Sequence, residues 1–441
     1  MGKREQHMGV YYLLGGTPLS GTVKVQKSKN AVLPMIAAAV LQDECVVLSG
    51  CPRITDVEDM IRIIVLLGGK ARWENGDLFL NCSGIRNHQI ERELSERTRS
   101  SVLFLGSLLA RFGRASIHRP GGCTIGRRPT DFHLMALSCL GAEVEEREGM
   151  LTAEGKSLSG SEILFPGISV GATENALLAA VLAEGVTVLG NPAKEPEIVH
   201  LCRFLRAMGA RIEGEGSGTI TVTGVSRLHG CRFVVPGDRI AAGTFLFAGA
   251  ITRGKVSLIG APTGEMKAAL ALYEKMGGQY HVSGGTLITD SRQIRAAVPF
   301  VETAPYPGFP TDLQSLYLAL AVTLEGSSRI RETVFESRFG TVLELQKMGA
   351  DLSVSGREIR TETSQLKGAD VTSPDLRGGA ALVLAGLAAE GITTVRQTER
   401  IERGYENFVE NFRGLGAEIL WEKEQETEES GTGVFWGDIR K

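Results

Sequence analysis

The sequence contains six copies of one short pattern, and this repeat constrains the fold more than any other feature. Each copy is Leu or Met, then Gly, then Gly or Ala, at the end of a stretch with helical periodicity. The central glycines, 67 to 73 residues apart, are Gly68, Gly141, Gly209, Gly277, Gly349 and Gly416. Helices commonly end in a glycine with left-handed conformation, so we predict that each of these glycines ends a helix and that a strand follows at once. The regular period predicts a chain of six equivalent units.

Each glycine is preceded, about 40 residues earlier, by a more apolar segment of helical length. These segments begin near Asn30, Ser100, Thr173, Ala242, Asp312 and Arg377. A β-branched stretch follows them, as at 46–48, 187–189 and 256–258. Because the segments are apolar on all sides, we expect buried helices, whereas the helix before each glycine is amphipathic and should face solvent. Each unit is therefore predicted to consist of a helix, a strand, a loop, a second helix, a turn and one or two strands, in this order. This is an α/β architecture.

Six units divide naturally into two domains of three, with the apolar helices inside and the sheets and amphipathic helices outside. We expect residues 29–236 to form a central domain that carries the cysteine loop described below. Residues 1–28 together with 237–441 are expected to form the second domain. A predicted strand near 21–25 precedes the first apolar helix, so we expect the N-terminus to pair with the C-terminal half.

The composition excludes several classes of protein. Lys and Arg number 48 and Asp and Glu 51, a net charge of −3, whereas a dedicated nucleic-acid binder shows a strong basic excess. No stretch approaches the ~18 apolar residues of a membrane span, and no secretory signal is visible. Seven cysteines without a Cys-x-x-Cys pair indicate reduced thiols. We expect a soluble cytoplasmic protein that binds neither nucleic acid nor membrane, with an acidic, solvated tail from residue 422.

The strongest candidate for chemistry is the loop at 120–133, which contains three glycines and two prolines. A single cysteine is most often a buried structural residue. Cys123 departs from that pattern because it lies among glycines with arginines, including Arg128, a few residues on. Nearby cations lower the pKa of a thiol and increase its reactivity. His133, taken alone, is typical of a structural histidine that makes hydrogen bonds.

Two further candidates lie at the starts of apolar helices, and each has a structural alternative. Lys29 is either a lysine whose stem lies along the surface or an ammonium held at a helix start to bind phosphate. Asp312 is either a helix N-cap or a general base toward a hydroxyl group.

Three arginines, Arg99, Arg377 and Arg403, lie near loop-to-helix junctions in different repeats. Any one of them alone is typical of a surface residue. Together with Lys29 and Arg128 they predict a cationic site for a small, multiply anionic substrate. The sequence has no Walker A motif, dinucleotide fingerprint or zinc-ligand pair, so we expect no bound cofactor and no metal.

Seven stretches, in order along the chain, resemble the MurA family of enolpyruvyl transferases, the UDP-N-acetylglucosamine 1-carboxyvinyltransferases. They are 29–30, 120–133, 169–173, 194–198, 304–312, 333–339 and 403–406. The resemblance runs from about residue 15 to residue 418, and the cysteine loop is highly specific. It implies the EPSP synthase-like fold, in which two inside-out α/β barrels each contain three repeated units, in agreement with the repeat count.

The resemblance implies transfer of enolpyruvate from phosphoenolpyruvate to the 3′-hydroxyl of UDP-N-acetylglucosamine, with release of phosphate, by addition and then elimination. This reaction is the first committed step of peptidoglycan synthesis. By position, Cys123 is the thiol that adds to or protonates phosphoenolpyruvate and the target of fosfomycin, and Asp312 is the base near the 3′-hydroxyl. Phosphoenolpyruvate is assigned to Lys29, Arg99, Arg128 and Arg403, supported by Asp375 and Arg377. The nucleotide-sugar site is assigned to Asn30, Arg128, Pro129, Thr130, Asp131, Phe132, His133, Ser169, Val170, Gly171, Asp312 and Val334.

Two positions depart from the family pattern. Residues 26–28 are Gln-Lys-Ser where the family more usually has Ser-Gly-Ala, and Gly167 stands where several members carry a basic residue near the diphosphate. Both leave open a specialised second copy of the enzyme. A separate alternative is a non-catalytic relative that binds UDP-N-acetylglucosamine and regulates wall synthesis. The sister activity, 5-enolpyruvylshikimate-3-phosphate synthase, shares the fold and phosphoenolpyruvate but lacks the cysteine loop. The oligomeric state stays open, and a monomer is compatible with the sequence.

Overall fold

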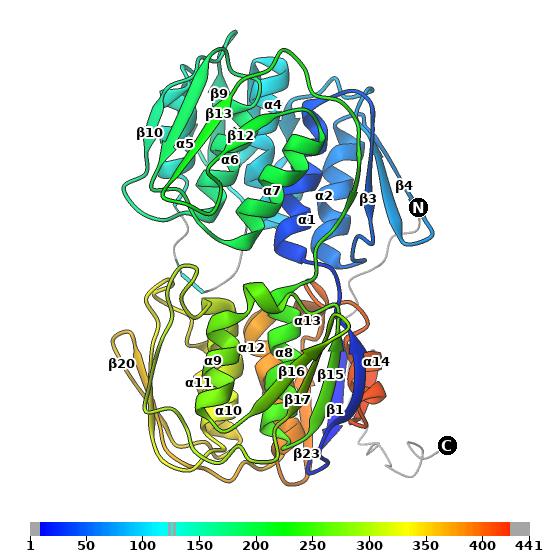
Figure 1. Ribbon diagram of the computed structural model, residues 1–441, viewed down its shortest axis with the longest axis vertical. Helices are drawn as coiled ribbons and strands as arrows, with labels where there is room; N and C mark the ends of the chain where they lie inside the picture. The colour runs from blue at the N-terminus through cyan, green and yellow to red at the C-terminus, as the bar shows by residue number, and fades with distance from the viewer. Residues whose placement is uncertain (1–8, 122–124, 127–128, 424–441) are drawn as a thin grey trace.

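The computed structural model describes residues 9–121, 125–126 and 129–423, and these form two lobes stacked along the longest axis (Figure 1). One hydrophobic core takes its buried residues from positions 31–235. The other takes them from positions 11–25 and 240–419, so a short N-terminal segment packs with the C-terminal half of the chain. We call these bodies the first lobe and the second lobe.

Among the described residues, the strands form six four-stranded sheets. In the first lobe the orders are β14 (Arg232–Val234), β3 (Cys45–Ser49), β5 (Asp77–Asn81), β4 (Lys70–Glu74); β6 (Gln89–Ile90), β7 (Arg114–His118), β9 (Met150–Glu154), β8 (Glu143–Arg147); and β10 (Glu162–Leu164), β11 (Val186–Gly190), β13 (Thr219–Thr223), β12 (Arg211–Glu213). In the second lobe they are β16 (Gln279–Ser283), β17 (Thr286–Asp290), β15 (Lys255–Ile259), β2 (Ser20–Lys24); β18 (Phe300–Glu302), β19 (Ser328–Arg331), β21 (Glu358–Thr361), β20 (Leu352–Ser355); and β22 (Asp370–Thr372), β23 (Ile392–Arg396), β1 (Gly9–Leu14), β24 (Glu418–Lys423).

The sheets share one plan, a parallel pair followed by antiparallel strands. In the third sheet β10 runs parallel to β11, with Ile163 opposite Leu189, and β11 runs antiparallel to β13. The last sheet follows the same plan, but its third strand, β1, comes from the N-terminus and pairs antiparallel with both β23 and β24. The sequence pattern did not predict β1, whose two partners lie about 380 to 410 residues further along the chain.

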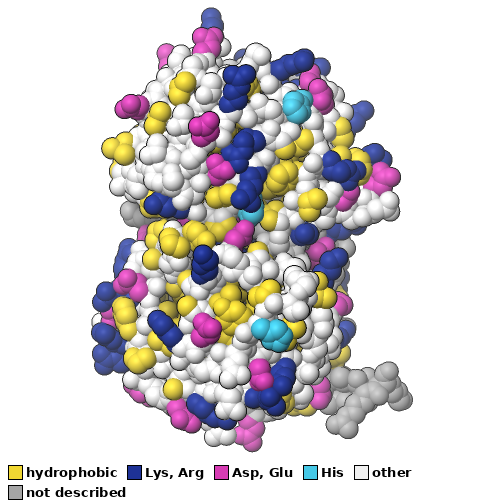
Figure 2. Space-filling view, in the orientation of Figure 1, with side chains coloured by type: hydrophobic (Ala, Val, Ile, Leu, Met, Phe, Trp, Pro, Cys, Tyr) yellow, Lys and Arg dark blue, Asp and Glu magenta, His cyan; other side chains and the backbone are white. Residues whose placement is uncertain are grey.

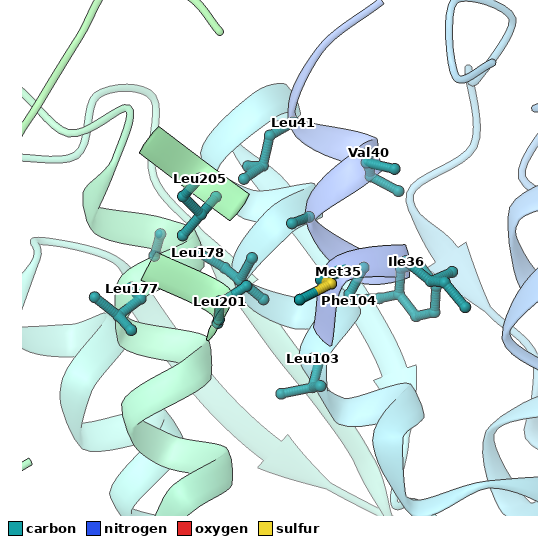
Figure 3. Packing of buried hydrophobic residues seen from close by; sticks show 14 of the residues in the cluster. Met35, Ile36, Val40, Leu41, Leu103, Phe104, Leu177, Leu178, Leu201 and Leu205 are labelled. Atoms are coloured by element: carbon teal, nitrogen blue, oxygen red, sulfur yellow. The ribbon is translucent and has the colours of Figure 1, made fainter. Parts of the chain in front are cut away.

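The interior of each lobe consists of helices. The first lobe holds α1 (Lys29–Ala38), α4 (Leu103–Phe112) and α6 (Val170–Ala180), and the second holds α8 (Arg239–Ile251), α10 (Gln314–Ala321) and α12 (Leu376–Ala388). Every residue of α8 from 240 to 251 is buried. Figure 3 shows side chains of the first lobe, among them Met35, Phe104 and Leu178, gathered between these helices. The predicted apolar helices are confirmed.

The second helix of each unit is only partly buried. These helices are α2 (Thr55–Leu66), α5 (Asp131–Cys139), α7 (Pro196–Ala207), α9 (Lys267–Lys275), α11 (Gly340–Lys347) and α14 (Phe408–Gly414). Short elements complete the chain: α3 (Arg92–Arg97), α13 (Glu399–Glu402), and the 3₁₀ helices η1 (Ala39–Leu41), η2 (Arg99–Val102), η3 (Thr263–Glu265) and η4 (Thr311–Leu313).

The six repeat glycines behave as predicted. Each follows the second helix of its unit and has a φ between 89° and 108°. Residues with a Cβ rarely adopt this conformation, so the glycine lets the chain leave the helix and begin the next strand within a residue or two. The predicted α/β fold with helices inside and sheets outside is therefore confirmed.

Within the described ranges the chain passes between the lobes twice, and the two passages lie side by side. Lys27 forms an isolated antiparallel bridge with Gly237. The amide of Ser28 donates to the carbonyl of Pro236 at 2.8 Å. The first passage leads directly into α1 and the second into α8, so both helices start at the junction between the lobes. Across the described ranges, no helix is both long enough and apolar enough to cross a membrane.

Candidate active site

A cavity of about 520 Å³ lies between the two lobes, which meet at the narrow waist of the molecule (Figure 2). Its wall includes the first residues of the central helices or of the 3₁₀ turns that lead into them: Lys29 and Asn30, Arg99, Val170, Arg239, Thr311, and Leu376 and Arg377. Unpaired backbone N–H groups and the helix dipole favour anions at such positions. The repeat therefore brings six equivalent helix starts to one cavity.

Local sequence explains why these helices begin where they do. The hydroxyl of Ser28 accepts from the amide of Ala31, and the carboxylate of Asp238 caps α8 in the same way. Ser169 and Asp375 likewise cap α6 and α12 with their own side chains. Ser and Asp are preferred N-caps because their oxygens satisfy amides that have no helical partner.

Lys29 and Arg403 converge on a single buried carboxylate. The Nζ of Lys29 lies 2.7 Å from Oδ2 of Asp56, and Nε of Arg403 lies 2.9 Å from Oδ1 of the same group. Burial raises the pKa of Asp56, but the charges of Lys29 and Arg403 outweigh this effect and hold the pKa below its usual value. The alternative that Lys29 is a surface residue is wrong, since its side chain is 12% exposed and ion-paired.

A second carboxylate, that of the half-buried Asp312, is held by two arginines. Its oxygens lie 2.9 Å from Nη2 of Arg338 and 3.2 Å from Nη2 of Arg377, and it accepts weakly from the side-chain amide of Asn30 at 3.4 Å. Burial raises the pKa of Asp312, but the charges of Arg377 and Arg338 hold it well below its usual range. The N-cap alternative is wrong, because the cap of η4 is Pro310 and Asp312 caps no helix. The group is a fixed anion in the cavity wall.

Arg338 and Glu332 organise the loop that follows β19. Glu332 is fully buried, and its Oε1 accepts from the amides of Val334 and Phe335. Nη1 of Arg338 donates to the hydroxyl of Thr311 at 2.9 Å. Val334, which the resemblance assigns to the nucleotide sugar, is therefore placed by a carboxylate two residues before it. Neither Arg338 nor Glu332 was assigned a role from the sequence.

His133 is buried against the start of α6. Its Nδ1 lies 3.0 Å from the side-chain amide of Asn175, and burial together with the charge of Arg99 lowers the pKa of His133 to about 3. A Cβ on Gly171 would lie 3.1 Å from the His133 ring, so only a glycine allows this approach without displacement. The structural, hydrogen-bonded histidine expected from sequence is present, and the same ring borders the cavity.

Another group of charges joins the lobes at the start of α7. Glu197 forms a two-point ion pair with Arg239 at 3.0 and 3.2 Å, and Glu195 accepts from the amide of Tyr306. Burial and the nearby charges of Glu197 and Glu195 raise the pKa of Glu174 well above its usual value. This acidic wall faces the same cavity as the cations, and sequence reasoning assigned it no role.

The structure brings most of the predicted residues together. Those that line the cavity are Lys29, Asn30, Arg99, Pro129, Asp131, Phe132, His133, Ser169, Val170, Gly171, Asp312, Val334, Asp375, Arg377 and Arg403. Thr130 is buried and is not part of the wall. Cys123 and Arg128 lie outside the described residues. Before them the amide of Gly121 donates to the carbonyl of Ser95, and between them the carbonyl of Ile125 accepts from the amide of Ser337 in the second lobe.

The described residues contain no group of three or more His, Cys, Asp or Glu arranged to hold a metal ion. Gly167, one of the two departures, lies beside Phe132, where a Cβ would be 3.5 Å from the ring. A side chain therefore has room at this position.

Comparison with known proteins places this fold and cavity in a class. A family model for EPSP synthase (3-phosphoshikimate 1-carboxyvinyltransferase) matches residues 13–412. The crystal structure of the enolpyruvyl transferase NikO from Streptomyces tendae is similar with a TM-score of 0.84 and 26% identity, over 95% of this chain and 100% of NikO. An EPSP synthase structure from Acinetobacter baumannii shares the fold at 21% identity, with a TM-score of 0.73 over 94% of this chain and 100% of that one. The class defined by fold and site is the enolpyruvyl transferases.

Curated sequences give the family within this class. UDP-N-acetylglucosamine 1-carboxyvinyltransferase 2 of Caldanaerobacter subterraneus is 41% identical over 94% of this chain and 99% of its own length. UDP-N-acetylglucosamine 1-carboxyvinyltransferase of Nitratidesulfovibrio vulgaris is 43% identical over 93% of this chain and 98% of its own. The chain belongs to the family of UDP-N-acetylglucosamine 1-carboxyvinyltransferases, or MurA proteins. The resemblance found in the sequence is confirmed.

Proposed function

We propose that the protein transfers the enolpyruvyl group of phosphoenolpyruvate to the 3′-hydroxyl of UDP-N-acetylglucosamine and releases phosphate, the first committed step of peptidoglycan synthesis. One observation carries the proposal most strongly. The cations Lys29 and Arg403, which are paired with Asp56, line the cavity. The carboxylate of Asp312, which is held by two arginines, lines the same cavity. A site for this reaction needs both features, because it must bind a phosphate and a carboxylate and also accept a proton from a hydroxyl group.

The cations hold the first substrate. In the proposal Lys29, Arg99 and Arg403, together with Arg128, neutralise the phosphate and carboxylate of phosphoenolpyruvate. Positive charge develops at C2 as C3 takes up a proton and the 3′-hydroxyl oxygen bonds to C2. In the elimination C3 gives up a proton, the C2–C3 double bond forms again, and the phosphate leaves with the electron pair of its bond to C2. Fixed charges around both groups stabilise the addition and the elimination, because they require no reorganisation during the reaction. Cys123 would be the thiol that adds to or protonates phosphoenolpyruvate.

Asp312 serves as the base in this scheme. Because Arg377 and Arg338 depress the pKa of Asp312, the carboxylate is ionised but weakly basic before substrate binds. When the carboxylate of phosphoenolpyruvate attracts Arg377, one of the two ion pairs loosens and the basicity of Asp312 rises. Substrate binding would then prepare the group to accept the proton of the 3′-hydroxyl as its oxygen bonds to C2.

Several finer points belong to the same proposal. Two domains enclose the substrates, one formed by residues 29–236 and the other by 1–28 plus 237–441. The nucleotide-sugar site is lined by Asn30, 129–133, 169–171 and Val334. The cation cluster is supported by Asp375 and Arg377. The protein works in the cytoplasm without a cofactor. The non-catalytic alternative is not favoured, because the relatives at 41–43% identity are all named as the enzyme.

Phosphate release from phosphoenolpyruvate tests the proposal, with UDP-N-acetylglucosamine or shikimate 3-phosphate as the acceptor, each with and without fosfomycin. We expect release only with the nucleotide sugar, and fosfomycin should block it. Release with shikimate 3-phosphate alone would assign the sister activity. A folded protein that binds UDP-N-acetylglucosamine but releases no phosphate would support the non-catalytic alternative.

A further inference from the structure

Gln26 lies in the first passage between the lobes, three residues before Lys29, and its side chain reaches a distant loop. Its Nε2 donates to the carbonyl of Gly404 at 2.9 Å, and its Oε1 accepts from the amide of Glu406 at 2.9 Å. Both bonds join groups about 380 residues apart in sequence. One amide side chain therefore holds the backbone of the segment that directly follows Arg403.

The same segment is packed against Lys29. A Cβ on Gly404 would lie 2.6 Å from a methyl group of Leu376 and 3.3 Å from Cδ of Lys29. The loop can approach the lysine stem this closely only because Gly404 has no side chain. The carboxylate of Glu406 also accepts from the amide of Arg53 in the first lobe, at 2.9 Å. The position of the loop thus determines where Arg403 lies relative to Lys29.

Gln26 also acts on Lys29 through its backbone. Its carbonyl accepts from the amide of Asp238 at 2.9 Å, and Oδ2 of Asp238 accepts from the amide of Lys29 at 3.1 Å. Gln26 is therefore connected to both cations that pair with Asp56. It is connected to Lys29 through Asp238, and to Arg403 through the backbone of Gly404 and Glu406. A serine, which the MurA family more usually has at this position, has a single short hydroxyl and cannot bond both backbone groups.

We propose that Gln26 is a positioning residue that holds the loop at 403–406, so that Arg403 and Lys29 meet over Asp56 before any substrate arrives. The inference rests on the proposed function, in which these two cations bind phosphoenolpyruvate. A preformed cation pair lowers the ordering cost of binding an anion. Gln26 thus sets the affinity for phosphoenolpyruvate without touching it.

Steady-state kinetics of Gln26→Ala test this role. Losing two hydrogen bonds to the loop should raise KM for phosphoenolpyruvate roughly five- to twentyfold, while kcat and KM for UDP-N-acetylglucosamine change less than about twofold. Gln42→Ala is the matched control, because the side-chain amide of Gln42 also donates to a backbone carbonyl, that of Ala39 at 3.2 Å. It should leave all three constants unchanged. An unchanged KM for phosphoenolpyruvate in Gln26→Ala, or equal changes for both substrates, overturns the proposal.

A double variant asks whether the effect passes through Arg403. Groups that act through one another give non-additive effects when both are changed. Gln26→Ala should therefore raise KM for phosphoenolpyruvate much less when it is introduced into the Arg403→Lys variant than when it is introduced into the wild type. Full additivity would show that Gln26 acts independently of Arg403 and would overturn the proposal.

Amide hydrogen exchange tests the loop independently of activity. The Glu406 amide should exchange slowly in the wild type and at least tenfold faster in Gln26→Ala, with no change in Gln42→Ala. Equal exchange in wild type and Gln26→Ala would overturn the positioning role even in a fully active enzyme. If the wild type releases no phosphate but exchange responds as expected, the loop is positioned as inferred and the proposed function is the part that fails.

Discussion

The ammonium of Lys29 and the carboxylate of Asp56 lie 2.7 Å apart in the wall of the cavity, with Asp56 3% exposed. Lys29 belongs to α1 and Asp56 to the first turn of α2, so both come from the first unit of the repeat. Arg403 reaches the same carboxylate from the second lobe. One buried anion thus holds two cations from different lobes together in the cavity wall.

Replacing Asp56 with Asn removes the negative charge that Lys29 and Arg403 share. We expect the substrate-free protein to lose roughly 2–4 kcal/mol of stability, because breaking a buried ion pair leaves charges uncompensated. Inorganic phosphate should then raise the melting temperature of Asp56→Asn more than that of the wild type, since the ion supplies the missing charge. Thermal unfolding with and without phosphate measures both effects. Asp77→Asn, which removes the exposed pair with Arg232, is the control and should change neither quantity appreciably.

Replacing Asp312 with Asn removes the proposed proton acceptor while keeping the shape of the side chain. We expect kcat to fall by about 10²-fold or more, with KM for UDP-N-acetylglucosamine changed less than about fivefold. Initial rates of phosphate release at saturating substrates provide the measurement. A variant that keeps a tenth or more of the wild-type kcat would exclude Asp312 as the base.

The stability of the protein should fall in mild acid because of His133. Burial and the charge of Arg99 lower its pKa to about 3 in the folded state, against an ordinary value of 6.5. The unfolded chain therefore binds the extra proton first. The contribution of His133 to the free energy of unfolding is complete above about pH 6.5. It is lost as the pH falls toward 3, by up to about 1.4 kcal/mol per pH unit.

Urea unfolding at several pH values between 7.5 and 5 measures this slope. His133→Asn, whose side-chain oxygen can still accept from Asn175, should flatten it. His281 is exposed, and His281→Asn should leave the slope unchanged. If His133→Asn and the wild type lose stability in parallel, another group is responsible.

Cys123 lies outside the described residues, and its role can be tested directly. Cys123→Ala should abolish or greatly reduce phosphate release while the protein stays folded. Cys123→Asp should keep a proton donor and resist fosfomycin. Cys139→Ala, which removes an exposed thiol elsewhere, should leave inhibition by fosfomycin unchanged. Inhibition of Cys123→Asp at the wild-type concentration of fosfomycin would contradict alkylation of this thiol.

The close contact between α4 and α6 depends on Gly106. Its amide donates to Oδ1 of Asn175 at 2.8 Å, and a Cβ would lie 2.4 Å from that oxygen. Gly106→Ala should therefore cost about 2–3 kcal/mol of stability, because the helices must move apart. Gly218→Ala is the control, since no atom lies within 4 Å of the added Cβ. Equal urea midpoints for the two variants would show that α4 and α6 separate without cost.

The repeat in the sequence predicted the larger part of the architecture, because its signals are local. Gly209 and Gly349 end their helices with φ of 103° and 89°, a conformation that depends on the few residues around each glycine. The apolar stretch that became α8 is buried almost throughout, as its composition indicates. The strand β1 was missed because its place depends on β23 and β24, which lie at the other end of the chain.

The six units, the class of fold and many of the residues that line the cavity could be predicted from the sequence, because these follow from local pattern and from resemblance to a family. How those residues are connected depends on the folded chain. Asp56 looks like an ordinary acidic residue in a first helical turn until Lys29 and Arg403 are found on either side of it. Gln26 looks like a departure from the family pattern until its amide is found on the loop after Arg403. Ion pairs, pKa shifts and positioning contacts depend on distances of a few ångströms between residues hundreds of positions apart, and the folded chain sets those distances.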